Sequence, residues 1–349
     1  MKRLRLAAVF VAAIILLGAA APQARCAQEA LEFTVVRKSF SHNASGLTLG
    51  LANLHAEVPG IAANKAKVLG ALAAFKKMGV NMAVFPEFVL SGYFWEDQVA
   101  CWPYMRKAAL ENQMDWLRRE VAPLLDHTLR YVVLNVLRKG EEGKFYNSNI
   151  VLAKDRPWTE LDAGYQKVFL PGIEKTYTVS GRDSQAVFDT EWGRFGLATC
   201  YDACFFPLFQ EYALDRHVDA VLVLASWRGP AERDYPGVGV RTDSYYADLW
   251  ELTLPALAAM NQVWILAANA VGEHAVSGAV FAGRSAVYAP SGLRLAQASG
   301  QGEELLVIEN LLIRQETARE RADFNYTDDF FRVYRKTTDG CFVRPRTSP

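Results

Sequence analysis

Residues 193–202 read GRFGLATCYD, an apolar run that stops at a thiol and continues into an acidic residue. This order is typical of a strand that ends in a sharp turn, so Cys200 is expected at the carboxyl end of a strand. Backbone N–H groups of the helix-like segment that follows could bind an oxyanion beside the sulfur. A lone cysteine is nevertheless more often a small buried apolar residue than a nucleophile, so catalysis requires a base and a cation from elsewhere in the chain.

Outward from this stretch, strand-like and helix-like segments alternate along the chain. Helices are expected at residues 61–78, 103–125, 206–214 and 244–261. Strands are expected at residues 33–37, 82–85, 131–137, 149–153, 194–199, 220–225, 263–269, 285–288 and 304–308, and a charged tail from residue 315. Several strands are apolar without alternation, which favours sheets covered on both faces. No internal repeat interrupts the pattern, so a layered α/β fold is expected.

The composition is that of an ordinary globular protein. The chain has 349 residues, of which 51% are hydrophobic and 22% charged, with a formal net charge of zero. This length is enough for a large core, and one or two domains would be consistent with it. The balanced charge offers no basic surface, so neither nucleic acid nor an anionic membrane is expected as a partner.

The N-terminus has the pattern of a secretory signal peptide. Three basic residues (Lys2, Arg3 and Arg5) precede an apolar run over residues 6–21, and small residues follow around residues 24–27. The apolar run is short for a bilayer span, which favours cleavage over an uncleaved anchor. We therefore expect a signal peptide over residues 1–27, a main domain over 28–313 and a C-terminal extension over 314–349. The protein would be periplasmic or secreted, without stable membrane association.

Five cysteines are present in the sequence. An oxidising compartment would allow a disulfide between Cys101 and Cys341, although their spacing does not establish one. Cys200 and Cys204 stand four positions apart, a separation that could suit a metal pair. No nearby histidine or second cysteine pair completes such a site, so metal binding is not expected.

Three segments end in residues that could act together. A short apolar strand leads to Glu87, the segment GYQKVFL at 164–170 presents Lys167, and GRFGLATCYD presents Cys200. Glu87 or Lys167 alone would be interpreted as an ordinary solvated surface residue. The order and the flanking residues of all three give the pattern its specificity.

The segments FPE at 85–87, QKVFLPGIEK at 166–175 and GRFGLATCYD at 193–202 resemble the nitrilase superfamily of carbon–nitrogen hydrolases. The resemblance runs from about residue 33 to residue 312, and it matches the Glu-Lys-Cys triad of that family to Glu87, Lys167 and Cys200. It implies a four-layer α-β-β-α sandwich, a homodimer formed through helices near the nucleophile, and chemistry without a cofactor.

The residue types make chemical sense in these roles. Cys200 would attack a carbonyl or nitrile carbon, and Glu87 would act as the general base. Lys167 and the Tyr201 N–H would stabilise the oxyanion, and the lysine charge should also favour the thiolate. Ammonia or an amine would leave, and water would then hydrolyse the thioester.

Several activities fit this triad. The leading hypothesis is an amidase-type hydrolase of a small non-peptide C–N bond. A nitrilase, an acyltransferase and a non-catalytic ligand-binding relative remain as alternatives. A Ser–His–Asp hydrolase has little support, because only five histidines occur and no Gly-x-Ser-x-Gly is present.

Two features bear on the substrate. Arg138 stands where many members of the family carry a second glutamate, and Glu141 or Glu142 could replace it from the following loop, unless both belong to a solvated turn. Tyr93 and Trp227 are candidates for the edges of the pocket, where they would suit an apolar or aromatic acyl group, and packing is the alternative.

Overall fold

The computed structural model describes residues 31–40, 42, 45–93, 98–154, 164–181 and 186–330. The expected signal peptide over residues 1–27 lies outside the described residues, as do residues 331–349 of the C-terminal extension and therefore Cys341. The elements described belong to one compact unit that begins at Glu32. No helix within these ranges has both the length and the apolar character needed to cross a membrane.

Two sheets form the centre of the fold. In spatial order, the strands of the first are β1 (Thr34–Ser39), β17 (Glu304–Leu311), β2 (Leu47–Asn53), β3 (Met82–Val84), β4 (Tyr131–Lys139), β5 (Phe145–Ala153) and β6 (Tyr165–Gln166). Those of the second are β16 (Arg294–Gln297), β15 (Ala286–Tyr288), β12 (Trp264–Asn269), β9 (Ala220–Ala225), β8 (Gly193–Thr199) and β7 (Val187–Thr190). The strands β2, β3 and β4 pair in parallel, as do β8, β9 and β12, so their carboxyl ends share one edge in each sheet.

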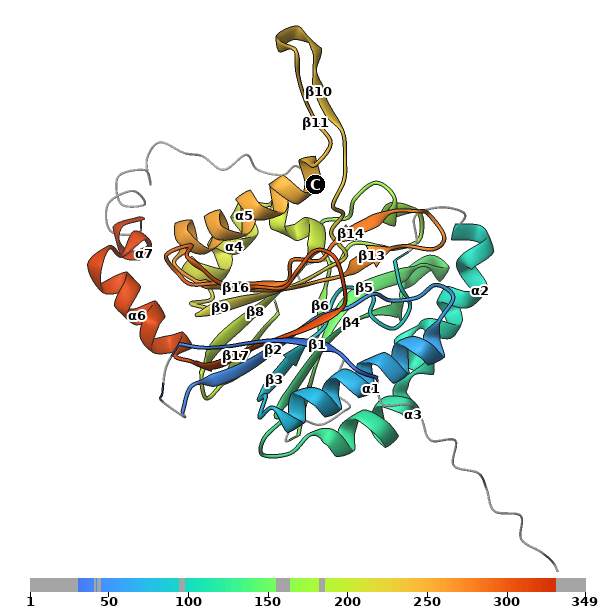
Figure 1. The fold of residues 1–349 in the computed structure, drawn as a ribbon, viewed down its shortest axis with the longest axis horizontal. Coiled ribbons are helices and arrows are strands. Elements are labelled where there is room, and N and C mark those ends of the chain that lie inside the picture. The colour runs from blue at the N-terminus through green and yellow to red at the C-terminus, as the bar shows by residue number, and fades with distance from the viewer. Residues whose placement is uncertain are drawn as a thin grey trace, which may run out of the picture. The chain divides into compact units, whose positions relative to one another are not determined.

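Helices flank the two sheets. They are α1 (Ile61–Lys77), α2 (Gln98–Ala108), α3 (Met114–Trp116), α4 (Phe206–Leu214), α5 (Tyr245–Asn261), α6 (Ile313–Asp323) and α7 (Tyr326–Asp329). Figure 1 shows α1 on one side of the paired sheets and α4 with α5 on the other. This is the expected α-β-β-α sandwich, and the expectation is confirmed.

Alternating side chains build the layers. In β9, Leu222 and Leu224 point into the core between the sheets, whereas Val221 and Val223 pack with the residues of α4 and α5. Successive residues of a strand face opposite sides, so a strand buried on both faces must be apolar throughout. This explains why β9 shows no alternation in its sequence.

Gly196 brings α4 close to the strand that leads to Cys200. A Cβ at this position would lie 2.9 Å from the ring of Tyr212 on α4, which is closer than side chains pack. The Tyr212 hydroxyl donates a hydrogen bond to the carbonyl oxygen of Leu197 at 2.6 Å. The helix is therefore fixed against β8 just before the turn that carries the thiol.

Three sequence expectations need correction. The helix expected over residues 103–125 is broken, because α2 ends at Ala108 and Ala109 is extended (ψ 145°), with short 3₁₀ and π turns following. The strand β2 was not expected, since Gly50 interrupts its apolar pattern, and this glycine leaves room for the ring of Phe75. The charged segment after residue 314 continues α6, whose Ile313 and Thr317 are buried.

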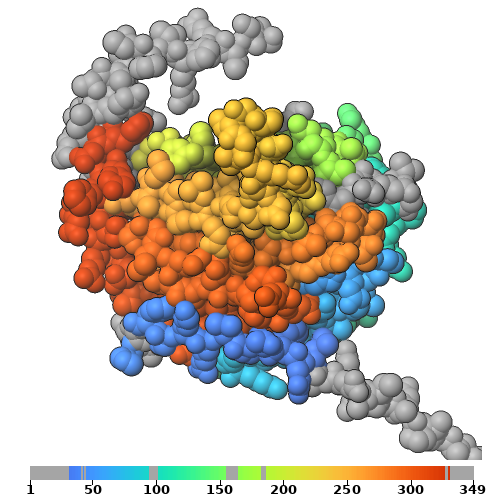
Figure 2. Space-filling view, turned by 45° about the horizontal axis from the view of Figure 1, so that its top comes forward, coloured from blue at the N-terminus to red at the C-terminus, as the bar shows by residue number. Residues whose placement is uncertain are grey.

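Two small hairpins complete the fold, β10 (Arg233–Tyr235) with β11 (Val240–Thr242) and β13 (Val271–Glu273) with β14 (Val280–Ala282). The first projects from the sandwich as an arm, and Figure 2 shows its yellow residues standing out on the face viewed. Apolar side chains near its tip are exposed, including Val238 at 75%.

A substitution in the layer between the sheets tests the sandwich. Phe195 is fully buried on β8 and stacks on Phe188 with ring centroids 5.5 Å apart. Phe195→Ala should lower the free energy of unfolding by about 3–5 kcal/mol, because it leaves a cavity that the two sheets cannot fill. Leu293→Ala, at a position that is 64% exposed, is the control and should change it by less than about 0.5 kcal/mol. Urea denaturation measures both, and equal effects would contradict the inter-sheet position of Phe195.

Candidate active site

The three residues singled out in the sequence meet at the carboxyl edges of the two sheets. Glu87 follows β3, Lys167 follows β6 and Cys200 follows β8. The Lys167 Nζ donates to Glu87 Oε1 at 2.9 Å, and both side chains are completely buried. Glu87 and Lys167 both act electrostatically on the Cys200 thiol, and the thiol is buried beside them. The structure therefore places the expected base, cation and nucleophile in one cluster.

A second carboxylate completes the surroundings of Lys167. Glu174 Oε1 accepts a hydrogen bond from the Lys167 Nζ at 2.5 Å and another from the Tyr93 hydroxyl at 2.6 Å. The Asn147 Nδ2 donates to both carboxylates, at 2.7 Å to Glu87 and 3.1 Å to Glu174. One buried ammonium is thus held between two buried carboxylates, and neutral donors satisfy part of their remaining hydrogen-bonding capacity.

The charges of this cluster stabilise one another. Burial lowers the pKa of Lys167, but the carboxylates of Glu174 and Glu87 together raise it by more. The net pKa therefore lies well above the ordinary value, and the amine stays protonated. Burial raises the pKa of Glu174, and the neighbouring Lys167 charge opposes that rise.

Glu174 fills the place for which Glu141 and Glu142 were considered. Those two residues lie in an exposed turn after β4, as the solvated-turn interpretation has it. Glu174 was quoted within QKVFLPGIEK but not singled out. Its position seven residues after Lys167 was the available signal, because a chain that reverses soon after a buried lysine can return a carboxylate to it.

The turn that carries Cys200 has unusual backbone geometry. Cys200 has φ +48°, in the left-handed region that residues other than glycine seldom adopt. The turn begins a short 3₁₀ segment over Cys200–Cys204, and the Tyr201 N–H lies at its start. A conformation of this kind persists only where neighbouring contacts enforce it.

Asp202 supplies such contacts. Its buried carboxylate accepts hydrogen bonds from the Thr199 N–H at 2.8 Å, the Phe169 N–H at 3.0 Å and the Tyr165 hydroxyl at 2.6 Å. Tyr165 and Phe169 stand two residues before and two residues after Lys167. One carboxylate therefore fastens the Cys200 turn to both sides of the lysine, a role that the sequence analysis did not anticipate.

Residues of the second sheet fix Glu87. The Ser226 N–H, at the end of β9, donates to Glu87 Oε2 at 2.9 Å, and the Ser226 hydroxyl donates to the Glu87 carbonyl oxygen at 3.0 Å. The Glu87 N–H in turn donates to the carbonyl oxygen of Ala225 at 3.3 Å. The carboxylate of Glu87 is therefore oriented by strands from both sheets.

The Cys200 thiol is protonated at rest. Burial raises its pKa first, and the negative charge of Glu87 raises it further, while Lys167 and the Ser226 backbone lower it. Lys167 favours the thiolate as expected, but burial and the two carboxylates outweigh it. Attack by this sulfur therefore needs a base to remove the proton as the substrate binds.

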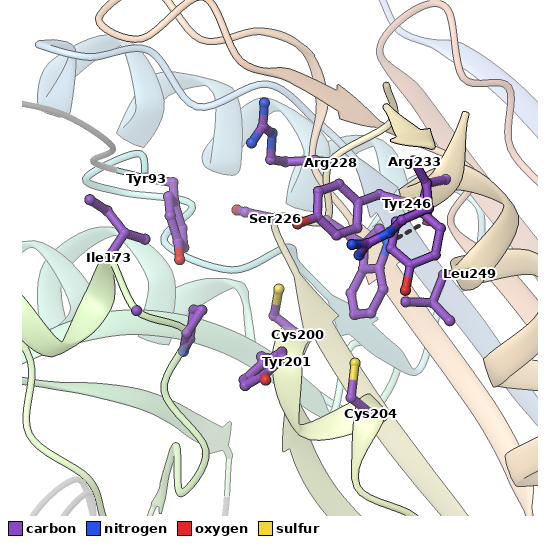
Figure 3. A pocket seen from close by; sticks show the side chains of 14 residues that line it. Tyr93, Ile173, Cys200, Tyr201, Cys204, Ser226, Arg228, Arg233, Tyr246 and Leu249 are labelled. Carbon is purple, nitrogen blue, oxygen red and sulfur yellow. Dashed lines mark hydrogen bonds between the residues drawn. The ribbon is translucent and has the colours of Figure 1, made fainter. Parts of the chain in front are cut away.

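The Cys200 sulfur points into a cavity of about 510 Å³ (Figure 3). Tyr93, Tyr201 and Trp227, the three residues expected around the nucleophile, all line this cavity. The Trp227 side chain is fixed by a hydrogen bond from its indole N–H to the Tyr246 carbonyl oxygen at 2.7 Å. Arg228 and Arg233, which the sequence analysis did not single out, also line it.

Cys204 is exposed, and its thiol lines the same cavity. Within the part of the chain that the structure describes, no group of three or more His, Cys, Asp or Glu side chains is arranged to bind a metal ion. Glu87, Lys167 and Cys200 supply a carboxylate, an ammonium and a thiol, which suit acid–base and nucleophilic chemistry.

Comparison with known proteins places this site in a family context. The family described as carbon–nitrogen hydrolase matches residues 49–314. An omega-amidase of Homo sapiens is 30% identical over 194 residues, which cover 53% of this chain and 62% of that protein. A probable nitrilase of Schizosaccharomyces pombe is 29% identical over 213 residues, which cover 61% of this chain and 68% of that protein. The match thus spans about two thirds of these relatives or less.

Solved structures share the fold. Saccharomyces cerevisiae Nit3, a member of the nitrilase superfamily, aligns with a TM-score of 0.65 at 20% identity over 80% of this chain and 95% of its own. An amidase of the same superfamily from Nesterenkonia AN1 aligns with a TM-score of 0.61 at 22% identity over 80% of this chain and 96% of its own. At this level of identity the likeness concerns the architecture alone.

Titration of Asp202 tests the turn that carries the thiol. Burial raises the pKa of Asp202 from its ordinary value of 3.8 to about 6. The folded state therefore binds this proton more tightly than the unfolded state, and the contribution of Asp202 to the free energy of unfolding falls as the pH rises from about 4 to 6, by roughly 3 kcal/mol. Asparagine does not titrate here, so Asp202→Asn should gain about that much stability relative to wild type over this range. Urea unfolding at several pH values measures the difference, and a difference independent of pH would contradict the buried carboxylate.

Proposed function

This chain belongs to the carbon–nitrogen hydrolase family, and we propose that it hydrolyses a small non-peptide amide through a thioester on Cys200. The observation that carries the proposal is the buried Lys167, held 2.9 Å from Glu87 Oε1 beside a cavity into which the thiol points. A base and a fixed cation next to a nucleophile are the groups that acyl transfer from nitrogen requires. The human relative, named an omega-amidase, supports an amide as the substrate class.

The first step forms the thioester. The Cys200 sulfur attacks the amide carbon while Glu87 takes the thiol proton, because the thiol is neutral at rest. Negative charge develops on the substrate oxygen, and Lys167 with the Tyr201 N–H stabilises it. Glu87 then gives its proton to the leaving nitrogen, the C–N bond breaks, and ammonia or an amine departs.

The second step releases the acid. A water molecule attacks the thioester carbon, and Glu87 accepts the proton that the water loses. The C–S bond breaks, the sulfur regains a proton, and the free carboxylic acid leaves the cavity. The balance is one amide and one water converted to one acid and one amine, with no cofactor consumed.

Glu174 has a different role from Glu87. It accepts hydrogen bonds from Lys167, Asn147 and Tyr93, and so its oxygens are committed to holding these three side chains. Glu87 contacts both the lysine and the second sheet, and its charge acts on the thiol. Glu87 is thus the base, and Glu174 positions Lys167 and balances its charge.

A nitrile is the second candidate substrate. Addition of the same sulfur to a nitrile carbon gives a thioimidate that two waters convert to acid and ammonia. The relative from Schizosaccharomyces pombe, named a probable nitrilase, is the observation that favours it.

Export and a homodimer belong to the same proposal. The basic, apolar and small residues of segment 1–27 support export to the periplasm or the medium. The resemblance of the sequence to nitrilases supports a homodimer. Analytical ultracentrifugation of the purified chain tests the oligomer, and a monomer at micromolar concentration would overturn it.

Replacement of the nucleophile is the central test. Cys200→Ala should abolish hydrolysis across a panel of small amides and nitriles, a loss of at least about a thousandfold, since it removes the thiol that lies beside Glu87 and Lys167. Intact-mass analysis of the wild-type protein mixed with substrate should find an acyl adduct on Cys200. Cys204→Ala is the matched control and should remain active, because that thiol is exposed and Glu87 is not among the groups that shift its pKa. Full activity in Cys200→Ala would sink the assignment.

The second glutamate can be tested against its sequence alternatives. Glu174→Gln removes one of the two carboxylate charges beside Lys167, so the lysine binds Glu87 more strongly and leaves that carboxylate less available to the thiol. We expect kcat to fall roughly a hundredfold, with slower alkylation of Cys200 by iodoacetamide. Glu141→Gln and Glu142→Gln, both in the exposed turn, should behave as wild type. If either control lost as much activity as Glu174→Gln, the assignment of the second glutamate would be incorrect.

A further inference from the structure

Three asparagines interrupt the apolar layer between the two sheets. The side chains of Asn135 on β4 and of Asn147 and Asn149 on β5 are completely buried. They share a strand face with Val133 and Val151, which pack in the core between the sheets, because positions an even number apart point the same way. A buried amide without hydrogen bonds is costly, so each of the three side chains needs partners in this layer.

The Asn135 amide has one permitted orientation. The Phe88 N–H donates to Asn135 Oδ1 at 2.8 Å. A backbone N–H can only donate, so the oxygen of this amide and not its NH2 group must face Phe88. The Asn135 Nδ2 then donates to Asn147 Oδ1 at 2.6 Å and to Asn149 Oδ1 at 2.7 Å. Both donors of the NH2 group are therefore used, and the Phe88 backbone sets the direction of the whole amide.

Asn135 in turn sets the direction of the Asn147 amide. The Asn147 oxygen accepts from Asn135, so its NH2 group faces the other way, toward the two buried carboxylates. It donates to Glu87 Oε1 at 2.7 Å and to Glu174 Oε2 at 3.1 Å. An amide turned by 180° would present its oxygen to these negative charges instead. The donor that Glu87 receives is thus fixed by an amide that does not touch Glu87.

The same asparagine holds the backbone beside the base. Phe88 follows Glu87 directly and has φ +52°, in the left-handed region that residues other than glycine seldom adopt. Its N–H is the group that Asn135 accepts from. On the other side, the Asn149 Nδ2 donates to the Ala198 carbonyl oxygen of β8 at 3.2 Å. Asn135 therefore connects the turn after Glu87, the carboxylate of Glu87 and the strand that carries the thiol.

We propose that Asn135 is a positioning residue for the reaction, and that it orients the Glu87 carboxylate through the Phe88 N–H and the Asn147 amide. This inference rests on the proposed function, in which Glu87 is the base. None of the three asparagines is among the described residues that line the cavity. Asn135 should therefore govern the chemical steps and not the binding of substrate.

The substitution Asn135→Asp tests this role. Aspartate keeps the shape of the side chain and an oxygen for the Phe88 N–H, but it has no NH2 group. Asn147 can satisfy the new carboxylate only by turning its own NH2 group away from Glu87. On a small amide that wild type hydrolyses, kcat should fall roughly tenfold to a hundredfold, with KM changed by less than about twofold.

Asn81→Asp is the matched control. The Asn81 Oδ1 also accepts from a backbone N–H, that of Thr48 at 2.9 Å, and its Nδ2 donates to the Thr128 carbonyl oxygen at 3.1 Å. Asn81 stands just before β3, at the opposite end of the strand from Glu87. Urea denaturation measures the stability that each variant loses, and Asn81→Asp should keep kcat within about twofold of wild type whatever that loss is.

A double-mutant cycle isolates the path through Asn147. Asn147→Leu removes the amide that Asn135 orients and keeps a similar volume. The charge added by Asn135→Asp acts in both backgrounds, so a difference between them comes from the orientation of the Asn147 amide. The loss of kcat caused by Asn135→Asp should be at least about fivefold smaller in Asn147→Leu than in wild type. An equal loss in both backgrounds overturns the inference, as does a loss that appears in KM alone or a kcat equal to that of wild type.

Alkylation separates this inference from the function on which it rests. If wild type hydrolyses no amide, the proposed function fails, and the rate at which iodoacetamide alkylates Cys200, followed by peptide mass spectrometry, decides the role of Asn135. The rate should be at least about fivefold lower in Asn135→Asp than in wild type and Asn81→Asp, and equal rates overturn the role. If Asn135→Asp does not fold, Asn135→Ser and Asn81→Ser are compared in the same assays, with the same outcomes deciding.

Discussion

The site depends on burying one ammonium group. Lys167 is removed from water completely, and an isolated charge in that position would cost several kcal/mol or would lose its proton. Glu87 and Glu174 keep it charged, and each of them is in turn held by a neutral donor. All three charges lie in one low-dielectric volume. A shift in the position of one of them therefore changes the electrostatic energy of the other two. The cation beside the Cys200 thiol is therefore fixed in both charge and position by the protein itself.

The four-layer architecture makes that burial feasible. The central strands of each sheet run parallel, so residues that follow them collect at one edge, and the stacked sheets bring their edges together. Glu87, which follows a strand of the first sheet, accepts two hydrogen bonds from Ser226 beside the second sheet and donates a third to the carbonyl oxygen of Ala225. Asp202 makes the corresponding link between the Cys200 turn and the segment around Lys167. Sheet packing and catalytic geometry are consequently set by the same few contacts.

The sequence was sufficient for the layered fold through its strand and helix patterns, and for the cluster of Glu87, Lys167 and Cys200 through the resemblance of three short motifs to the nitrilase superfamily. It was insufficient where tertiary contacts decide. No periodic or compositional pattern in the sequence distinguishes Glu174. Its carboxylate reaches Lys167 because the chain reverses direction after that lysine. The sequence over residues 103–125 has a helical pattern, but the helix ends at Ala108 in the structure. Gly50 interrupts the apolar pattern of β2, so that buried strand was not predicted. Arg233 sits on an arm whose residues are almost all exposed, so no apolar pattern predicts its place beside the cavity.

The contacts around the thiol join residues that are far apart in the sequence. The bonds from Glu87 reach 80 residues along the chain to Lys167 and 139 residues to Ser226. Closing loops of this length costs conformational entropy, so these contacts depend on the rest of the fold to hold them. In an incompletely folded chain Cys200 has neither base nor cation near it and is an ordinary thiol. The reactivity proposed for this cysteine is thus a property of the folded chain and not of the local sequence around the thiol.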